Sequence, residues 1–228
     1  SMPLMFANSA HFRKMKNINI PILAIDFEGS RRIGVVEYGV AKIENGAVSE
    51  LRTGICAPKT KIPQRDAEFF GIDNEEAFKH PPFSESVAEF CEMRKTGIFA
   101  AHNASVEDGL LRDAAPAPAI VPDFAFGGMR ASWSPWIDSC ALLKKIFPTL
   151  DSAKLSSAID AFGLKGELDA LAEKFCPPSR KKWHCAPYDS LACALLIIGL
   201  CRMDGFENAT VEWLAKHSAA PRDTTASL

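Results

Sequence analysis

The sequence predicts an α/β fold in a single domain, with a mixed β-sheet covered by helices. Three observations predict it: an apolar, strand-like run near the N-terminus, two strand-like runs that follow it across short turns, and helical patterns that alternate with short apolar segments in the remainder. Strands that come first and then alternate with helices are typical of a mixed sheet. Of the 228 residues, 47% are hydrophobic, which is enough to fill one core.

The first three strands are expected to form an antiparallel meander. Residues 21–27 form an apolar run with strand character, and residues 33–43 (IGVVEYGVAKI) contain the β-branched and aromatic side chains that favour strands. The tripeptide ENG then turns the chain into a third strand over residues 47–56.

Helices, one further strand and two connections are expected in the rest of the chain. Residues 58–80 are polar and punctuated, whereas residues 84–95 begin with a capping Ser84 and place apolar side chains along one helix face. Residues 97–103 (GIFAAHN) predict a short buried strand, and residues 114–136, rich in Pro, Gly and Ala, predict a long irregular connection. The remaining helical patterns cover residues 105–113, 140–147, 154–162, 168–175, 187–202 and 207–216.

Composition narrows the classes of function. The formal net charge of -2 gives no overall basic field, so any contact with nucleic acid must be local or mediated by metal. No apolar run reaches the roughly 18 residues that a membrane span needs, so no membrane partner is expected. Seven cysteines without a C-x-x-C pair favour reduced, buried thiols in a cytoplasmic protein over a zinc site.

The two ends of the chain are expected to lie outside the domain. Residues 1–18 lack the apolar core of a signal peptide and are expected to be an N-terminal extension, with Ser1 as a residue left by cloning. Residues 19–217 are expected to form the domain, and residues 218–228 a disordered tail.

Two acidic side chains, Asp26 and Glu28, end the first apolar run (ILAIDFEGS). On a strand they would share one face about 6.6 Å apart, where like charges repel. A fold tolerates such a pair on a solvated edge, bridged here to Arg31 or Arg32, or around a cation. The same D-x-E spacing recurs at Asp73, where capping of the following helical segment explains it.

A second acidic cluster lies in AAHNASVEDGLL, where an apolar strand ends at His102 and Asn103. A helix is expected to begin near Ser105, with Glu107 and Asp108 in its first turn. Ser105 and Asp108 match an S-x-x-D capping box, so Asp108 has a local role available. Glu107 has none, and the positive helix N-terminus favours its ionised form. His102 is expected to orient the loop.

The third cluster lies in WHCAPYDSLACALL. Pro187 suits the first turn of a helix, which places His184 in the loop before that helix and Asp189 in its opening turn. Both side chains are expected to face the mouth of a site. On these residues alone the alternative stays open, because a histidine before a helix is usually solvated and a first-turn aspartate often pairs with the helix dipole.

Together these motifs resemble the three motifs of the DEDD-type 3′→5′ exonuclease superfamily, histidine branch. Members include the proofreading epsilon subunit of the bacterial replicative polymerase and ribonuclease T. The resemblance covers about residues 21–202, because VVEYGVAKIENG, FFGID with PPFSESVAEF, and IDSCALLKKIFP also resemble the family's intervening segments. It implies a ribonuclease H-like fold, with a central mixed five-stranded sheet flanked by helices.

The resemblance also implies an activity: release of nucleoside monophosphates from single-stranded DNA or RNA 3′ ends, with two Mg²⁺ or Mn²⁺ ions. Four carboxylates would hold the ions, and a histidine would take the proton from the attacking water. The carboxylates are Asp26, Glu28, Glu107 and Asp189, and the histidine is His184. The residues expected to bind substrate are Phe27, Gly29, Ser30, His102 and Asn103.

The sequence departs from the family at two motifs. Gly29 and Ser30 replace the usual Thr-rich turn, and Val106 and Glu107 replace the usual Phe-Asp pair. Glutamate is one methylene longer than aspartate, so Glu107 would shift the metal slightly or act through water. This swap is the only support for the alternative function, a catalytically impaired binding protein that docks on a polymerase or another partner, and the intact acids and histidine argue against it.

Short basic and aromatic segments are expected to grip the single-stranded end. One candidate is SRKKWH, residues 179–184, and a second is Arg130 with Trp133 and Trp136. For both segments the alternative is solvated loop charge and half-buried tryptophan. A polymerase or a second copy of the chain is a further expected partner.

Overall fold

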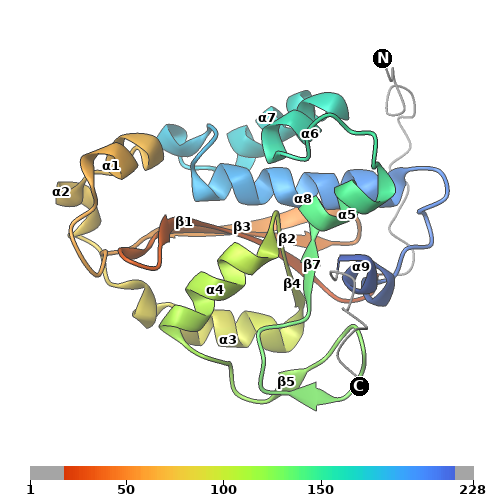
Figure 1. Ribbon diagram of the computed structural model, residues 1–228, viewed down its shortest axis with the longest axis horizontal. Helices are drawn as coiled ribbons and strands as arrows, with labels where there is room; N and C mark the ends of the chain where they lie inside the picture. The colour runs from red at the N-terminus through yellow and green to blue at the C-terminus, as the bar shows by residue number, and fades with distance from the viewer. Residues whose placement is uncertain (1–17, 219–228) are drawn as a thin grey trace, which may run out of the picture.

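A mixed sheet of five strands lies at the centre of the computed structural model, which describes residues 18–218 (Figure 1). The strands are β1 (Ile22–Ser30), β2 (Gly34–Glu44), β3 (Ala47–Ile55), β4 (Ile98–Ala101) and β7 (Trp136–Asp138). Their order is β3-β2-β1-β4-β7; β1 to β3 form an antiparallel meander, whereas β1, β4 and β7 run parallel. The predicted meander and the predicted mixed five-stranded sheet are confirmed. The expected N-terminal extension and C-terminal tail lie outside the described residues, apart from Ile18 and Ser218.

Helices cover both faces of the sheet (Figure 1). They are α1 (Gln64–Phe70), α2 (Asn74–Ala77), α3 (Val87–Thr96), α4 (Ala104–Ala114), α5 (Ser139–Ile146), α6 (Leu155–Ala161), α7 (Lys165–Phe175), α8 (Ala186–Arg202) and α9 (Val211–Ser218), with the 3₁₀ turns η1 (Phe83–Glu85) and η2 (Pro178–Arg180). Within the described chain, no helix combines the length and the apolar character that crossing a membrane requires.

Most of the predicted helices are present, and two connections differ from the prediction. The segment expected only to be polar contains α1, which ends at Gly71 in the left-handed conformation that favours glycine. The connection expected to be irregular contains a short antiparallel pair, β5 (Val121–Pro122) and β6 (Met129–Arg130). The expected helix after Asp73 is α2, and the Asp73 carboxylate accepts a hydrogen bond from the backbone N–H of Glu76, as predicted for a cap.

Strand β1 is buried on both faces. Ile25 and Phe27 belong to the apolar cluster that includes residues of α3 and α4, whereas Ala24 belongs to the cluster built around α8. Side chains alternate along a strand, so Asp26 and Glu28 continue the face that α8 covers. Figure 1 shows α8 along this face, with α3 and α4 on the opposite side.

The start of α8 lies directly against β2. Gly39 of β2 has no room for a side chain, because a Cβ atom there would lie 2.3 Å from the carbonyl oxygen of Ala186 in α8. Gly39 is also the register partner of Asp26. This close approach brings the first turn of α8 over the end of β1.

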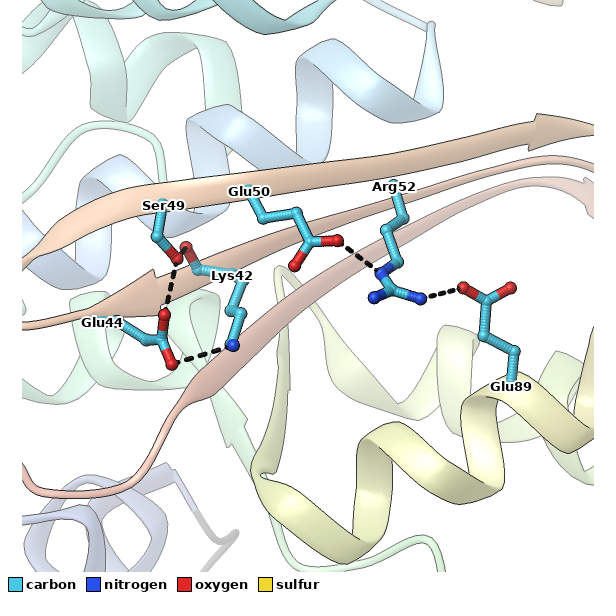
Figure 2. Close-up of polar contacts among 6 residues, drawn as sticks. All are labelled: Lys42, Glu44, Ser49, Glu50, Arg52 and Glu89. Carbon is cyan, nitrogen blue, oxygen red and sulfur yellow. Dashed lines mark hydrogen bonds and ion pairs between the residues drawn. The ribbon is translucent and has the colours of Figure 1, made fainter.

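Ion pairs along β2 and β3, together with hydrogen bonds of Ser49 between the two strands, surround the β2–β3 hairpin, and one ion pair connects it to α3 (Figure 2). Arg52 of β3 pairs with Glu50 at 2.7 Å and with Glu89 of α3. Lys42 pairs with Glu44 at 2.8 Å. Because β3 is an edge strand, these charged side chains discourage pairing of its free edge with another strand.

Candidate active site

The carboxyl end of β1 carries Asp26 and Glu28 in the middle of the sheet. A bulge follows Glu28, and Gly29 has φ 148°, a conformation that side chains disfavour. A Cβ atom on Gly29 would lie 2.2 Å from the carbonyl oxygen of Gly34, so glycine is required at the point where β1 ends. Arg31 pairs with Asp113 at 3.5 Å. The alternative of a solvated edge pair is therefore wrong, because β1 is a central strand and Glu28 is buried.

The start of α8 places two more predicted residues beside Glu28. Ligand atoms of Glu28, His184 and Asp189 all lie within 4.8 Å of one another. The backbone N–H of His184 donates to Asp189 Oδ2 at 3.2 Å, which fixes the loop to the helix. His184 is exposed, as expected for the mouth of a site. Asp189 is buried, which corrects the expectation that both side chains face the mouth.

Helix α4 contributes a buried carboxylate, Glu107, from its first turn. The structure contradicts the expected capping box: α4 begins at Ala104, and Asn103 holds the cap position with φ 77°. Asp108 instead accepts a hydrogen bond from Trp136 Nε1 at 2.9 Å. Of the two neighbouring acids on α4, therefore, only Glu107 is buried. Its negative charge raises the pKa values of Asp26 and Glu28 on β1.

The side chain that accepts hydrogen bonds at the start of α4 belongs to Asp138 at the end of β7, and the sequence prediction missed it. Its carboxylate accepts hydrogen bonds from the N–H groups of Asn103 at 3.1 Å and Ala104 at 3.0 Å. It also accepts from Ala141 at 3.0 Å, so one side chain holds the starts of α4 and α5 together. An acid that ends a strand-like segment (WID) and comes directly before a helical pattern is the signal that could have indicated this capping role.

His102 and Asn103, the polar pair that follows β4, also help to hold the starts of these helices in place. His102 Nδ1 lies 2.8 Å from the hydroxyl of Ser139, and Nε2 lies 2.8 Å from the carbonyl oxygen of Ala153. Both ring nitrogens are engaged, so His102 orients the loop as expected and offers no free ring nitrogen to a substrate. Asn103 is exposed beside it.

Burial and mutual repulsion raise the pKa values of the acids in this cluster. Burial, followed by the negative charges of Asp189, Glu28 and Glu107, raises the pKa of Asp26 well above its ordinary value. Burial and the charge of Asp189 raise the pKa of Glu28 to about 8. Burial also raises the pKa of Glu107 to about 8 and that of Asp189 to about 7. The fold therefore brings together charges that destabilise one another without a counter-ion.

The residues present fit a divalent metal ion. Glu107 Oε2 and Asp189 Oδ1 are buried and have no hydrogen-bond partner within the described part of the chain. Buried carboxylate oxygens left unpaired are costly, and hard cations such as Mg²⁺ and Mn²⁺ prefer such oxygen ligands. Carboxylates from β1, α4 and α8 therefore offer oxygen ligands of the kind that such an ion prefers.

Several residues expected to grip the substrate are structural instead. Trp133 is fully buried and Trp136 is buried against Phe99, so neither tryptophan offers a stacking surface. Arg130 pairs with Asp123 at 2.6 Å. The prediction of a gripping segment around Arg130 is wrong, because both tryptophans are buried and the Arg130 side chain pairs with Asp123.

The β1 residues expected to bind substrate divide into two groups. The side chain of Phe27 is buried 5.2 Å from the ring of Phe83, measured between centroids, so a contact of this side chain with substrate is contradicted. Gly29 and Ser30 are partly exposed at the end of β1, next to Glu28. Only this end of the strand is open to a ligand.

An exposed aromatic residue beside the cluster was missed because α1 was not predicted. The Phe69 ring of α1 lies 4.0 Å from the His184 ring between centroids, tilted by 34°. Phe69 is 55% exposed, which is unusual for a large apolar side chain. Its ring therefore lies beside His184, the exposed member of the cluster.

Comparison with known proteins bears on the fold. No protein-family profile matches the sequence. A curated relative, DNA polymerase III PolC-type from Clostridium perfringens, is 22% identical over 138 residues, which are 60% of this chain and only 9% of that polymerase. The structure of exonuclease X in complex with 5′ overhanging duplex DNA superimposes with a TM-score of 0.62 and 18% identity, covering 87% of this chain and 99% of that one.

A second solved structure agrees with the first. The nuclease domain of 3′hExo, a DEDDh family member bound to rAMP, superimposes with a TM-score of 0.61 and 14% identity, covering 83% of this chain and 94% of that one. The expected ribonuclease H-like architecture is therefore confirmed, and the chain has the fold of the DEDD-type 3′→5′ exonucleases.

Proposed function

We propose that this protein is a 3′→5′ exonuclease that depends on two Mg²⁺ or Mn²⁺ ions and releases nucleoside monophosphates from single-stranded 3′ ends. The observation that carries the proposal is the convergence of Glu28, His184 and Asp189 within 4.8 Å, at the end of β1. The buried oxygen of Glu107, which is unpaired within the described residues, supports it, and so does the raised pKa of Asp26 beside these acids.

The chain's own residues divide into metal-holding and proton-accepting groups. Asp26, Glu28, Glu107 and Asp189 would hold the ions. When bound, the ions would stabilise negative charge on the phosphoryl oxygens and make water a stronger acid. His184 would accept the proton of the attacking water, because its imidazole is exposed beside the carboxylates.

The substrate is proposed to be the 3′ end of single-stranded DNA or RNA. Exonuclease X is described with DNA and 3′hExo with rAMP, so both sugars occur among the structural neighbours. Lys182 is exposed two residues before His184, and Phe69 presents its ring nearby. A cation with an aromatic surface would hold a phosphate and a base without reading sequence.

The proposed setting follows from composition and from the polymerase relative. All seven cysteines are free thiols, which fits a reducing compartment, and we place the protein in the cytoplasm. The likeness to a PolC-type polymerase suggests a polymerase as docking partner; a second copy of the chain is the alternative.

The experiment compares matched DNA and RNA oligonucleotides, each labelled at the 3′ terminus, incubated with Mg²⁺, Mn²⁺ or EDTA. The proposal expects labelled mononucleotide to appear from at least one oligonucleotide, only with metal present. Intact oligonucleotides of both sugars across pH 7 to 9 would overturn it. Binding without cleavage would support the alternative of a nuclease-fold binding protein.

A further inference from the structure

A buried guanidinium lies four residues before His184. Arg180 donates from Nε to Glu37 Oε1 at 2.8 Å and from Nη2 to Glu37 Oε2 at 2.6 Å. The Arg180 side chain is 7% exposed and that of Glu37 is 1% exposed. This two-bond pairing uses the planar fork that only arginine provides. It fastens η2 to strand β2 of the sheet.

The same side chain reaches a third element. Arg180 Nη1 donates to the carbonyl oxygen of Gly71 at 3.2 Å, at the end of α1. Phe69, whose ring packs on His184, belongs to this helix. The guanidinium of Arg180 therefore connects η2, β2 and α1, the helix whose Phe69 ring packs against His184.

The loop between Arg180 and α8 is anchored at both ends on Glu37. Beyond His184, the backbone N–H of Ala186 donates to Glu37 Oε2 at 2.8 Å. Between these anchors His184 has φ 63°, a left-handed conformation that residues other than glycine adopt only when their surroundings hold them there. Glu37 is also the register partner of Glu28.

We infer that Arg180 is a positioning residue: its fork to Glu37 and its bond to Gly71 fix His184 between Phe69 and Asp189. This inference rests on the proposed function, because it takes His184 as the proton acceptor. A buried ion pair is weak evidence for stability by itself, since well-packed apolar side chains often replace one without loss. These hydrogen bonds hold the chain on both sides of His184, whose backbone is in the left-handed conformation. Arg180 therefore has a role in positioning His184 beyond any contribution to stability.

The test variant is Arg180→Lys. Lysine keeps a positive charge beside Glu37 but lacks the fork, so it cannot hold both carboxylate oxygens and the Gly71 carbonyl in this geometry. We expect kcat to fall roughly 10- to 100-fold, because small misplacements of a catalytic group have effects of this size. KM and the Mn²⁺ dissociation constant should stay nearly unchanged, since the four carboxylates remain in place.

Arg94→Lys is the matched control. Arg94 is also fully buried and donates three hydrogen bonds, to the carbonyl oxygens of Trp133, Pro122 and Ser134. It lies in α3, on the face of the sheet opposite α8. This variant should lose a similar amount of thermal stability while keeping the wild-type kcat.

An NMR measurement tests the positioning without any activity. The Phe69 ring should shift the ring protons of His184 through its ring current, and Phe69→Leu gives their positions without that effect. Phe69 is exposed, so this variant should fold. In Arg180→Lys the His184 signals should move toward the positions in Phe69→Leu, whereas in Arg94→Lys they should stay at the wild-type positions.

The results of these experiments distinguish the positioning role of Arg180 from the proposed exonuclease function. Unmoved His184 signals in Arg180→Lys, or a kcat no lower than that of Arg94→Lys at equal loss of stability, would overturn the positioning role. A wild-type protein that cleaves no oligonucleotide would overturn the proposed function. The NMR comparison would then still decide whether Arg180 fixes the His184 ring.

Discussion

The indole Nε1–H of Trp136 donates a hydrogen bond to the carboxylate of Asp108 at 2.9 Å, and this contact separates two neighbouring acids on α4. Trp136 belongs to β7, so the bond fastens α4 to the sheet. Glu107 lies about 100° away around the helix, buried and with one oxygen unpaired within the described residues. The two acids therefore have different tasks.

Substitution at these two positions should separate activity from stability. Glu107→Ala should abolish nuclease activity without lowering the melting temperature, because it removes a buried carboxylate that other acids repel. Asp108→Ala should keep most activity but lose about 1 to 3 kcal/mol of stability, since it leaves the buried Trp136 N–H unpaired. Cleavage assays and thermal unfolding on both variants check this. The reverse pair of results would assign the metal-holding role to Asp108.

His184→Ala tests the proton acceptor. Turnover should fall about 10²-fold or more, which is the contribution of a general base. The Mn²⁺ affinity, measured by calorimetry, should be nearly unchanged, because the four carboxylates proposed to hold the ions remain. Since a ring nitrogen of His184 lies within 4.8 Å of ligand atoms of Glu28 and Asp189, a collapse of metal affinity would identify it as a ligand instead.

The metal-free protein should lose stability as the pH rises. The pKa is about 8 for Glu28 and Glu107 and about 7 for Asp189, all above the values near 4 of an unfolded chain. The folded state therefore holds more protons than the unfolded state over this interval, so the free energy of unfolding decreases with pH. In EDTA the melting temperature should fall from about pH 5 to about pH 8.

Added Mg²⁺ should oppose this loss most strongly at the alkaline end, where the carboxylates have released their protons and bind the ion. Glu107→Gln is the control, because it removes one of the titrating groups and should flatten the pH dependence. A melting temperature in EDTA that rises over the same interval would show that burial and mutual repulsion do not raise the pKa values of these carboxyl groups in the folded state.

Gly39→Ala should disturb the site from β2. The new methyl group would lie 2.3 Å from the Ala186 carbonyl, so the start of α8 must move away from Asp26 and carry Asp189 with it. We expect a lower melting temperature and a loss of turnover. Gly166→Ala in α7 is the control: nothing lies within 4 Å of its Cβ position, and alanine should stabilise that helix by about 0.5 to 1 kcal/mol. Equal behaviour of the two variants would mean that α8 adapts without cost.

Local patterns in the sequence were sufficient for the sheet and for the positions of the acids. Asp26 and Glu28 end a β-rich run, and Pro187 marks the start of a helix, so their elements could be predicted from neighbouring residues. The thiols expected to be buried and reduced are free, and five of the seven are buried.

The predictions that failed concern residues whose interaction partners are distant in the sequence. The side chain that accepts hydrogen bonds at the start of α4 belongs to Asp138, whose partner Asn103 lies 35 residues earlier, so the local match of Ser105 and Asp108 was misleading. Arg180 lies in a basic run that suggests an exposed surface, but it is buried against Glu37, 143 residues earlier in the chain. Such pairings depend on the topology of the sheet and have no local signature.

Anomalous diffraction from crystals grown with Mn²⁺ tests the central claim most directly, because it locates metal without relying on activity. Two anomalous peaks are expected about 3.5 to 4 Å apart, in contact with the carboxylates of β1, α4 and α8. Crystals of Glu107→Ala grown in the same way should show at least one peak weakened. Wild-type crystals with no peak at the end of β1, or with manganese bound only elsewhere on the molecule, would show that these carboxylates do not form the metal site.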